Sequence, residues 1–144
     1  MTYQYNDGGR SAAGYKGTAG DCVARAIAIA ADLPYAEVYA TLAQGRGSQR
    51  AGKRGKSSAS ARNGIDVTRK WFKDYMSSLG FVWTPTMGIG TGCKVHLDAD
   101  ELPKGRLIAS VSKHYSVMID GVINDTSNPS RGGKRCVYGY WAKV

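Results

Sequence analysis

The sequence lacks any long hydrophobic run and any sign of a secretory leader. No stretch of about 18 consecutive apolar residues occurs, so no membrane-spanning helix is predicted. The first residues, MTYQYNDGGRS, lack the basic and then apolar layout of a secretory signal. We therefore expect a cytoplasmic protein with no membrane partner. A length of 144 residues suits one domain, and 42% hydrophobic residues can supply its core.

Cysteine and histidine are both scarce. The odd number of cysteines, Cys22, Cys93 and Cys136, and the missing signal argue against a disulfide framework. His96 and His114 are the two histidines. Cys93 and His96 have the spacing of metal ligands, but a structural zinc site needs about four ligands and few candidates are left. We expect no metal and no cofactor.

Acidic residues are outnumbered, and the excess positive charge is concentrated in one stretch. The chain has 20 Lys and Arg against 11 Asp and Glu, a net charge of +9. Residues 45–64, GRGSQRAGKRGKSSASARNG, contain no acidic residue and five glycines, which predicts a mobile, solvated loop. The loop could serve only solubility, or it could contact nucleic acid or an acidic protein. The residues for such a contact are Arg46, Arg50, Lys53, Arg54, Lys56 and Arg62.

Hydrophobic spacing divides the chain into a helical half and a β half. Apolar residues at three- and four-residue steps predict helices over 22–31, 33–45 and 65–79. Strands are expected at 81–84, within 107–119, after the Asp120-Gly121 turn and at 136–141, whereas residues 1–20 are expected to be irregular. Helices followed by a small antiparallel sheet predict a single α+β domain over residues 1–144.

Cys22 stands at the start of the helix predicted over 22–31. Asp21 is a good N-cap residue, and the helix is apolar nearly all round, as expected of a central, buried helix. The positive end of a helix favours the thiolate form of a cysteine. The backbone N–H of Cys22 would also lie near an oxyanion formed at an attacked carbonyl. A cysteine that only filled the core would need neither effect.

The hairpin register nominates a base and an acid to accompany this thiol. With Asp120-Gly121 as the turn, Ile119 pairs with Val122 and Ser116 with Asp125. The side chain of His114 then shares a face with Asp125, which can orient the imidazole. Taken singly, the histidine could be structural and the aspartate could cap a turn. Together with Cys22 they form one geometry, that of a Cys-His-Asp triad.

GDCVARAIA and the later KHYSVMIDGVINDT resemble the papain-like cysteine peptidase superfamily. The first stretch and the His-aromatic pair also resemble ovarian-tumour-type deubiquitinases, and bacterial C39-like peptidases are similar in pattern. As a whole, the chain resembles small proteins of tailed bacteriophages, which would place it in the bacterial host cytoplasm or in the virion. The resemblance implies a papain-like fold with a central N-terminal helix that carries the cysteine.

The same resemblance implies a cysteine-dependent enzyme that acts on a peptide or amide substrate. It would be a hydrolase of peptidase, isopeptidase or amidase type, or an acyl transferase that shares the first half of the reaction. Its catalytic residues would be Cys22, His114 and Asp125. Papain-type enzymes place a glutamine before the cysteine as an oxyanion donor, and this chain has Lys16 there, with Thr18 as another candidate. That departure leaves an alternative open: an inactive papain-like protein that binds nucleic acid or an acidic partner through its basic loop.

Overall fold

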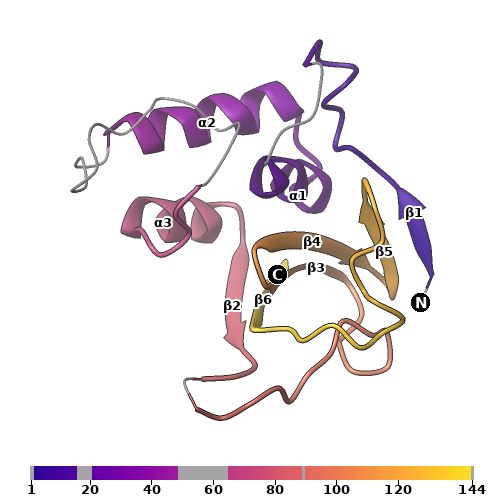
Figure 1. Ribbon diagram of the computed structural model, residues 1–144. Helices are drawn as coiled ribbons and strands as arrows, with labels where there is room; N and C mark the ends of the chain where they lie inside the picture. The colour runs from indigo at the N-terminus through magenta and orange to yellow at the C-terminus, as the bar shows by residue number, and fades with distance from the viewer. Residues whose placement is uncertain (1, 16–20, 49–64, 89, 144) are drawn as a thin grey trace.

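A computed structural model describes residues 2–15, 21–48, 65–88 and 90–143 (Figure 1). These residues form three helices and six strands, an α+β arrangement as the sequence predicts. The elements in chain order are β1 (Tyr3–Tyr5), α1 (Cys22–Ala31), α2 (Tyr35–Ser48), α3 (Lys70–Ser78), β2 (Phe81–Pro85), β3 (Arg106–Val111), β4 (His114–Ile119), β5 (Val122–Asp125) and β6 (Gly139–Lys143). Among the described residues, no helix combines the length and hydrophobicity needed to cross a bilayer.

The sheet is mixed, and the expectation of a purely antiparallel sheet is wrong. Its strand order is β1-β5-β4-β3-β6-β2, and the pairing of β1 with β5 is parallel while the other pairs are antiparallel. Strand β1 falls in the segment that the sequence predicts to be irregular. It has three residues, all exposed, so no buried face marks it in the sequence.

The three helices lie on the same side of the sheet (Figure 1). Helix α1 packs closest to the centre, against β4, β3 and β5, and seven of its ten residues are buried. The core between the helices and the sheet is built around Ile27, Phe72 and Ile108, which are fully buried. A second cluster, around Leu97, Leu107 and Met118, fills the other face of the sheet beneath the connecting loops. The nearly all-apolar sequence of α1 thus reflects burial on several sides.

Two tight turns set the register of β3, β4 and β5. The predicted pairs Ile119 with Val122 and Val117 with Asn124 are both confirmed. The run predicted over 107–119 is divided by a turn at Ser112 and Lys113, so it forms two antiparallel strands rather than one. This turn places His114 at the start of β4.

The helix boundaries differ from those expected. Helix α3 begins at Lys70 rather than at residue 65. Asp66 accepts hydrogen bonds from the backbone N–H and hydroxyl of Thr68, which form a turn instead. Helix α2 continues past Gly45 to Ser48, so Arg46 lies in its last turn and not in a loop. Residues 49–64, the rest of the predicted basic loop, lie outside the described residues.

A disulfide joins Cys93 to Cys136, contrary to the expectation that the cysteines stay unpaired. The two Cα atoms are 5.8 Å apart although 43 residues separate them in sequence. A β-bridge between His96 and Cys136 brings the two segments together, and no pattern in the sequence predicts this bridge. Cys22 takes no part in the pairing and is a free, half-buried thiol.

Candidate active site

Cys22 is the first residue of α1, where the backbone N–H groups of the helix have no intrahelical acceptor. The start of the helix is anchored by the side chain of Asp21, which is 1% exposed. The carboxylate forms an ion pair with Arg10, with Oδ2 2.9 Å from Nε, and also contacts Arg25 and Tyr35. Asp21 occupies the N-cap position, as predicted, but its side chain makes no capping hydrogen bond. Its physical role is to fix the start of α1 through two arginines and a tyrosine.

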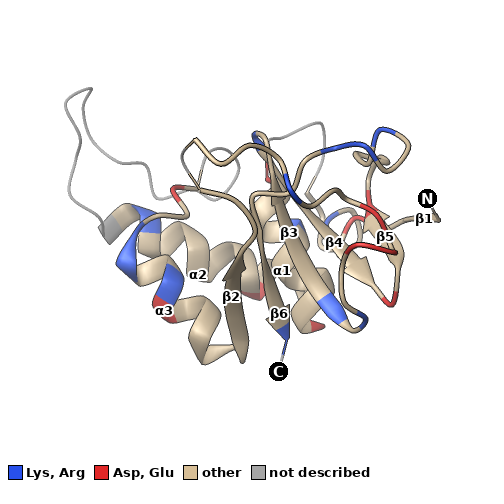
Figure 2. Ribbon diagram, turned by 90° about the horizontal axis from the view of Figure 1, so that it is seen from below, with Lys and Arg blue, Asp and Glu red and all other residues tan. Residues whose placement is uncertain are grey.

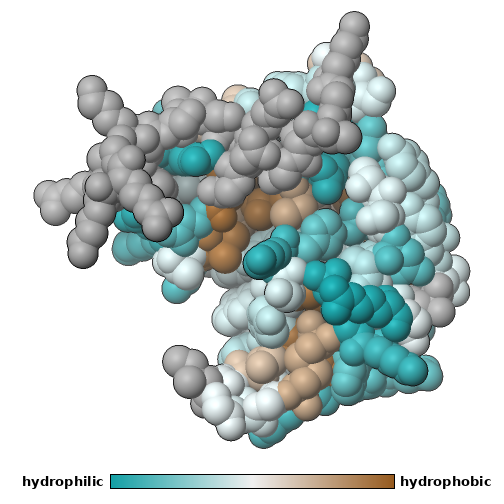
Figure 3. Space-filling model, in the orientation of Figure 1, coloured by the Kyte–Doolittle hydropathy of each residue, from teal (hydrophilic) through white to brown (hydrophobic). Residues whose placement is uncertain are grey.

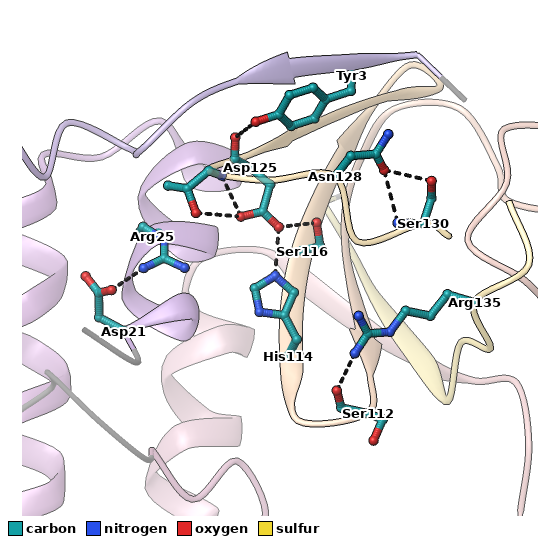
Figure 4. Close-up of polar contacts among 11 residues, drawn as sticks. Tyr3, Asp21, Arg25, Ser112, His114, Ser116, Asp125, Asn128, Ser130 and Arg135 are labelled. Carbon is teal, nitrogen blue, oxygen red and sulfur yellow. Dashed lines mark hydrogen bonds and ion pairs between the residues drawn. The ribbon is translucent and has the colours of Figure 1, made fainter. Parts of the chain in front are cut away.

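His114 and Asp125 come from adjacent strands and face each other (Figure 4). The distance from His114 Nε2 to Asp125 Oδ2 is 2.7 Å. Burial raises the pKa of Asp125, but the hydrogen bonds from His114 and Ser116 outweigh it, so the pKa lies below its ordinary value. An ionised carboxylate only accepts hydrogen bonds, so Nε2 carries the hydrogen and Nδ1 is left for another partner.

Further contacts hold Asp125 in place from three directions. Ser116 donates its hydroxyl hydrogen to Asp125 Oδ2 at 2.7 Å, and the backbone N–H of Thr126 donates to Oδ1 at 2.7 Å. The backbone carbonyl of Asp125 accepts bonds from the Tyr3 hydroxyl at 3.1 Å and from the Asn6 N–H at 2.9 Å. Strand β1 and its continuation thus fix the backbone, while β4 and the residue after β5 fix the carboxylate.

The thiol and the imidazole perturb each other in the direction of an ion pair. Burial raises the pKa of Cys22, but a hydrogen bond from His114, one from the Tyr115 backbone and the charges of His114 and Arg25 lower it overall. Burial lowers the pKa of His114, but the hydrogen bonds to Asp125 and Cys22 raise it overall to about 9. The arrangement therefore favours a thiolate next to an imidazolium.

Cys22 and His114 line the same pocket, which has a volume of about 410 Å³. Other parts of its wall are formed by Val23 of α1, by Val67 of the segment before α3, and by Tyr115 and Tyr138 on the side of the sheet. A small molecule or an extended peptide segment could therefore reach the thiol. The pocket lies where the start of α1 meets the beginning of β4.

The structure brings three of the predicted site residues together and leaves the others apart or undescribed. Cys22, His114 and Asp125 form one connected group. Arg46 is on α2, outside the residues that line the Cys22 pocket. The remaining candidates lie outside the described residues; they are Lys16, Thr18, Arg50, Lys53, Arg54, Lys56 and Arg62.

The residues considered as metal ligands have other partners. His96 Nδ1 lies 3.0 Å from Glu101 Oε1, and the Cys93 sulfur is bonded to Cys136. Within the described ranges, no group of three or more potential ligands gathers in the geometry of a metal site. Cys93 is thereby removed as a thiolate ligand while the disulfide is intact.

Sequence reasoning missed Ser116 and Tyr3 as supports of Asp125. Ser116 could have been found, because the same hairpin register places it directly across from the aspartate. Tyr3 could not, because its contact depends on the parallel pairing of β1 with β5, 122 residues away in sequence. Tyr15 packs on Tyr35 and Tyr39, with ring centres 4.9 Å away in each case.

Comparison with known proteins adds no family to this geometry. No protein-family model matches the chain, and no match is found among the curated proteins or the solved structures. Function is therefore inferred from the surroundings of Cys22, His114 and Asp125.

Proposed function

We propose that the protein is a cysteine-dependent hydrolase of peptides or other amides with a papain-like arrangement of Cys22, His114 and Asp125. One observation carries the proposal. His114 is hydrogen-bonded through Nε2 to a buried aspartate and lines one pocket with the only free thiol among the described residues, whose pKa it lowers. A thiol at a helix start that shares a pocket with an oriented imidazole matches a nucleophile and its base.

The proposed reaction begins with the Cys22 thiolate, formed when the thiol proton passes to His114 Nδ1. The sulfur attacks the carbonyl carbon of the amide, and the carbonyl electron pair moves onto the oxygen. When the carbon–nitrogen bond breaks, the imidazolium returns its proton to the leaving amine. Water, deprotonated by His114, then attacks the thioester and releases the acid together with the free thiol. Asp125 stays ionised and stabilises the imidazolium throughout.

The oxyanion needs hydrogen-bond donors beside the thiol. The backbone N–H of Cys22 lies at the start of α1 and is suited to this role because it has no acceptor within the helix. Lys16 and Thr18 are proposed as the side-chain donors, because they precede the cysteine closely in sequence. A lysine would bring a full positive charge where papain-type enzymes use a neutral amide.

The test is alkylation of the native protein with iodoacetamide between pH 4 and 10, read at each cysteine by mass spectrometry. We expect Cys22 to react with a midpoint below its ordinary pKa of 9.0, because its thiolate is stabilised. His114→Ala should move the midpoint back toward that value. His96→Ala is the matched control: it removes the other histidine, which pairs with Glu101, and should leave the profile unchanged.

An ordinary or elevated midpoint at Cys22, unaffected by His114→Ala, would contradict the proposed pair. In that case the binding alternative would gain support, and its own signature would be salt-dependent retention on nucleic acid with no effect of Cys22→Ala. Hydrolysis itself is tested separately, by comparing the native protein and Cys22→Ala on a mixed peptide library.

A further inference from the structure

Two more pockets share lining residues with the one at Cys22 but none with each other, and their chemistry differs. The first, of about 340 Å³, shares Tyr115 and Tyr138 with the Cys22 pocket and extends to Trp83 and Trp141. The second, of about 600 Å³, shares Lys113 and His114 with it. We call the first the aromatic pocket and the second the cationic pocket. The three pockets follow one another, with the thiol in the middle one.

The aromatic pocket offers exposed rings that the fold does not cover. Trp83 is 39% exposed and Tyr138 is 41% exposed, and both are among the few large hydrophobic side chains that the described part of the chain leaves at the surface. The rings of Trp83 and Trp141 lie 5.2 Å apart and form one wall. Exposed aromatic residues that gather around a hollow indicate binding of an apolar group.

The cationic pocket has basic residues and no acidic residue in its lining. Its lining includes Lys113, Arg131 and Arg135 and contains no Asp or Glu. Arg135 is held in place because its Nη2 donates to the carbonyl of Ser112 at 2.6 Å, beside His114 (Figure 4). Asp125 is buried and engaged by its own hydrogen bonds, so it does not cancel this charge at the surface. Figure 2 shows Lys and Arg along the loops above the sheet.

Hydrophobic residues and strongly hydrophilic residues lie side by side on the hollowed face of the molecule (Figure 3). The lining residues give the two adjoining pockets their different chemistry, with rings in the aromatic pocket and cations in the cationic pocket. A substrate that reaches from one to the other meets an apolar surface at one end and a charged surface at the other.

The proposed chemistry assigns a direction to the substrate. The acyl part of the substrate becomes bonded to Cys22, so it occupies the Cys22 pocket. Its side chain then extends into the aromatic pocket, which adjoins the Cys22 pocket. The leaving amine must lie next to His114, which protonates it. The cationic pocket borders His114 but not Cys22, so it is positioned to receive what is attached to that amine.

We propose that the enzyme cleaves amide bonds between an acyl residue with a bulky apolar or aromatic side chain and a leaving group that carries a carboxylate, as in an acidic peptide. This inference rests on the proposed function, since it assigns roles to the two sides of the Cys22–His114 pair. Lys113 and Arg131 recognise the carboxylate, and Trp83 and Tyr138 pack on the apolar side chain.

The test of the cationic side compares two alkylating reagents of similar size, iodoacetate and iodoacetamide, on the whole protein. The double variant Lys113→Gln/Arg131→Gln should lower the rate of Cys22 with anionic iodoacetate about fivefold while changing the rate with neutral iodoacetamide less than about twofold. The matched control is Lys70→Gln/Lys134→Gln, which removes the same charge from exposed lysines outside the pocket and should leave both rates unchanged. Salt should weaken the effect in the native protein.

The aromatic side is tested with the chloromethyl ketones of N-acetyl-Phe and N-acetyl-Gly. The Phe reagent should inactivate Cys22 at least about tenfold faster, and Trp83→Ala should narrow the difference, because burial of an aromatic side chain is favourable. Val82→Ala is the control, since this exposed neighbour on β2 is not part of the pocket.

The outcomes separate the two levels of the argument. If Cys22 reacts slowly with iodoacetamide, and His114→Ala does not change that rate, the proposed function fails. If Cys22 is reactive but the pocket variants change neither the iodoacetate rate nor the preference for Phe, the function stands and the substrate assignment is overturned. A loss shared equally by iodoacetate and iodoacetamide would also overturn it, because the cations would then support the thiolate rather than a carboxylate.

Discussion

Ser116 and His114 both donate a hydrogen bond to Oδ2 of Asp125, each at a donor–acceptor distance of 2.7 Å. The carboxylate is 4% exposed, so these bonds replace the water that it would have at the surface. A serine two residues along the strand from the histidine thus shares in fixing the group that orients the ring.

Asp125→Asn should lower the pKa of His114 from about 9 toward its ordinary 6.5, because the negative partner is lost. If the proposed reaction is correct, turnover should fall about 10²–10⁴-fold, since the ring would lose its orientation and charge stabilisation. The measurement is NMR titration of the His114 ring together with cleavage of a peptide substrate. Ser116→Ala should shift the same pKa less, and equal effects of the two variants would contradict the assigned roles.

The free energy of unfolding should depend on pH through His114. Its folded pKa of about 9 lies above 6.5, so its contribution is complete below pH 6.5 and is lost as the pH rises to 9. Asp125 has a lowered pKa, so its contribution is present above pH 3.8 and is lost as the pH falls below that value. The lowered pKa of the Cys22 thiol has the opposite effect to His114, because its contribution to stability grows as the pH rises toward 9.0. Urea unfolding is therefore best measured in Cys22→Ser, which lacks this contribution. In this variant, His114→Gln should remove the loss of stability above pH 6.5.

Asp21 should be one of the residues least tolerant of truncation. Asp21→Ala would leave Arg10 and Arg25 without their shared carboxylate in a largely buried setting. We expect a loss of about 3–5 kcal/mol in unfolding free energy, typical of breaking a buried ion pair. Denaturant unfolding measures it, with the exposed pair of Lys70 and Asp74 as the control. Asp74→Ala should cost less than about 1 kcal/mol, and similar losses in both variants would contradict the role given to Asp21.

The Cys93–Cys136 bond should stabilise the purified, oxidised protein. A closed loop with a sequence separation of 43 corresponds to about 4 kcal/mol in the loop-entropy relation. Intact mass should rise by about 2 Da upon reduction, as expected for two added hydrogens. The melting temperature should fall in Cys93→Ser/Cys136→Ser, while the rate at which Cys22 reacts with iodoacetamide should remain unchanged. Alkylation of Cys93 in the unreduced protein would show that the bond is absent.

The α+β class, the three helices and the hairpin register could be predicted from the sequence because each depends on local information. Apolar spacing defines α1, and Asp120-Gly121 admits one tight turn between Ile119 and Val122. The candidate triad followed from the same facts: a helix start sets the position of Cys22, and the register sets His114 beside Asp125.

The boundaries and distant pairings could not be predicted. A single sequence gives no signal that Tyr3 pairs alongside Ile123, that Cys93 meets Cys136, or that α2 continues beyond Gly45. Close approach of segments far apart in the chain depends on how the whole core packs, and local propensity is too weak to specify it.

The sequence by itself determined the chemistry available: one cysteine at a helix start, a histidine and an aspartate on one face of a hairpin, and an excess of positive charge. Only the tertiary structure decided how these groups are used. It placed the thiol of Cys22 in one pocket with His114, turned the carboxylate of the N-cap residue Asp21 toward two arginines, and gathered Lys113 and Arg131 beside a neighbouring pocket. Side-chain type is written in the chain, whereas desolvation, charge proximity and pocket shape arise only when distant segments pack together.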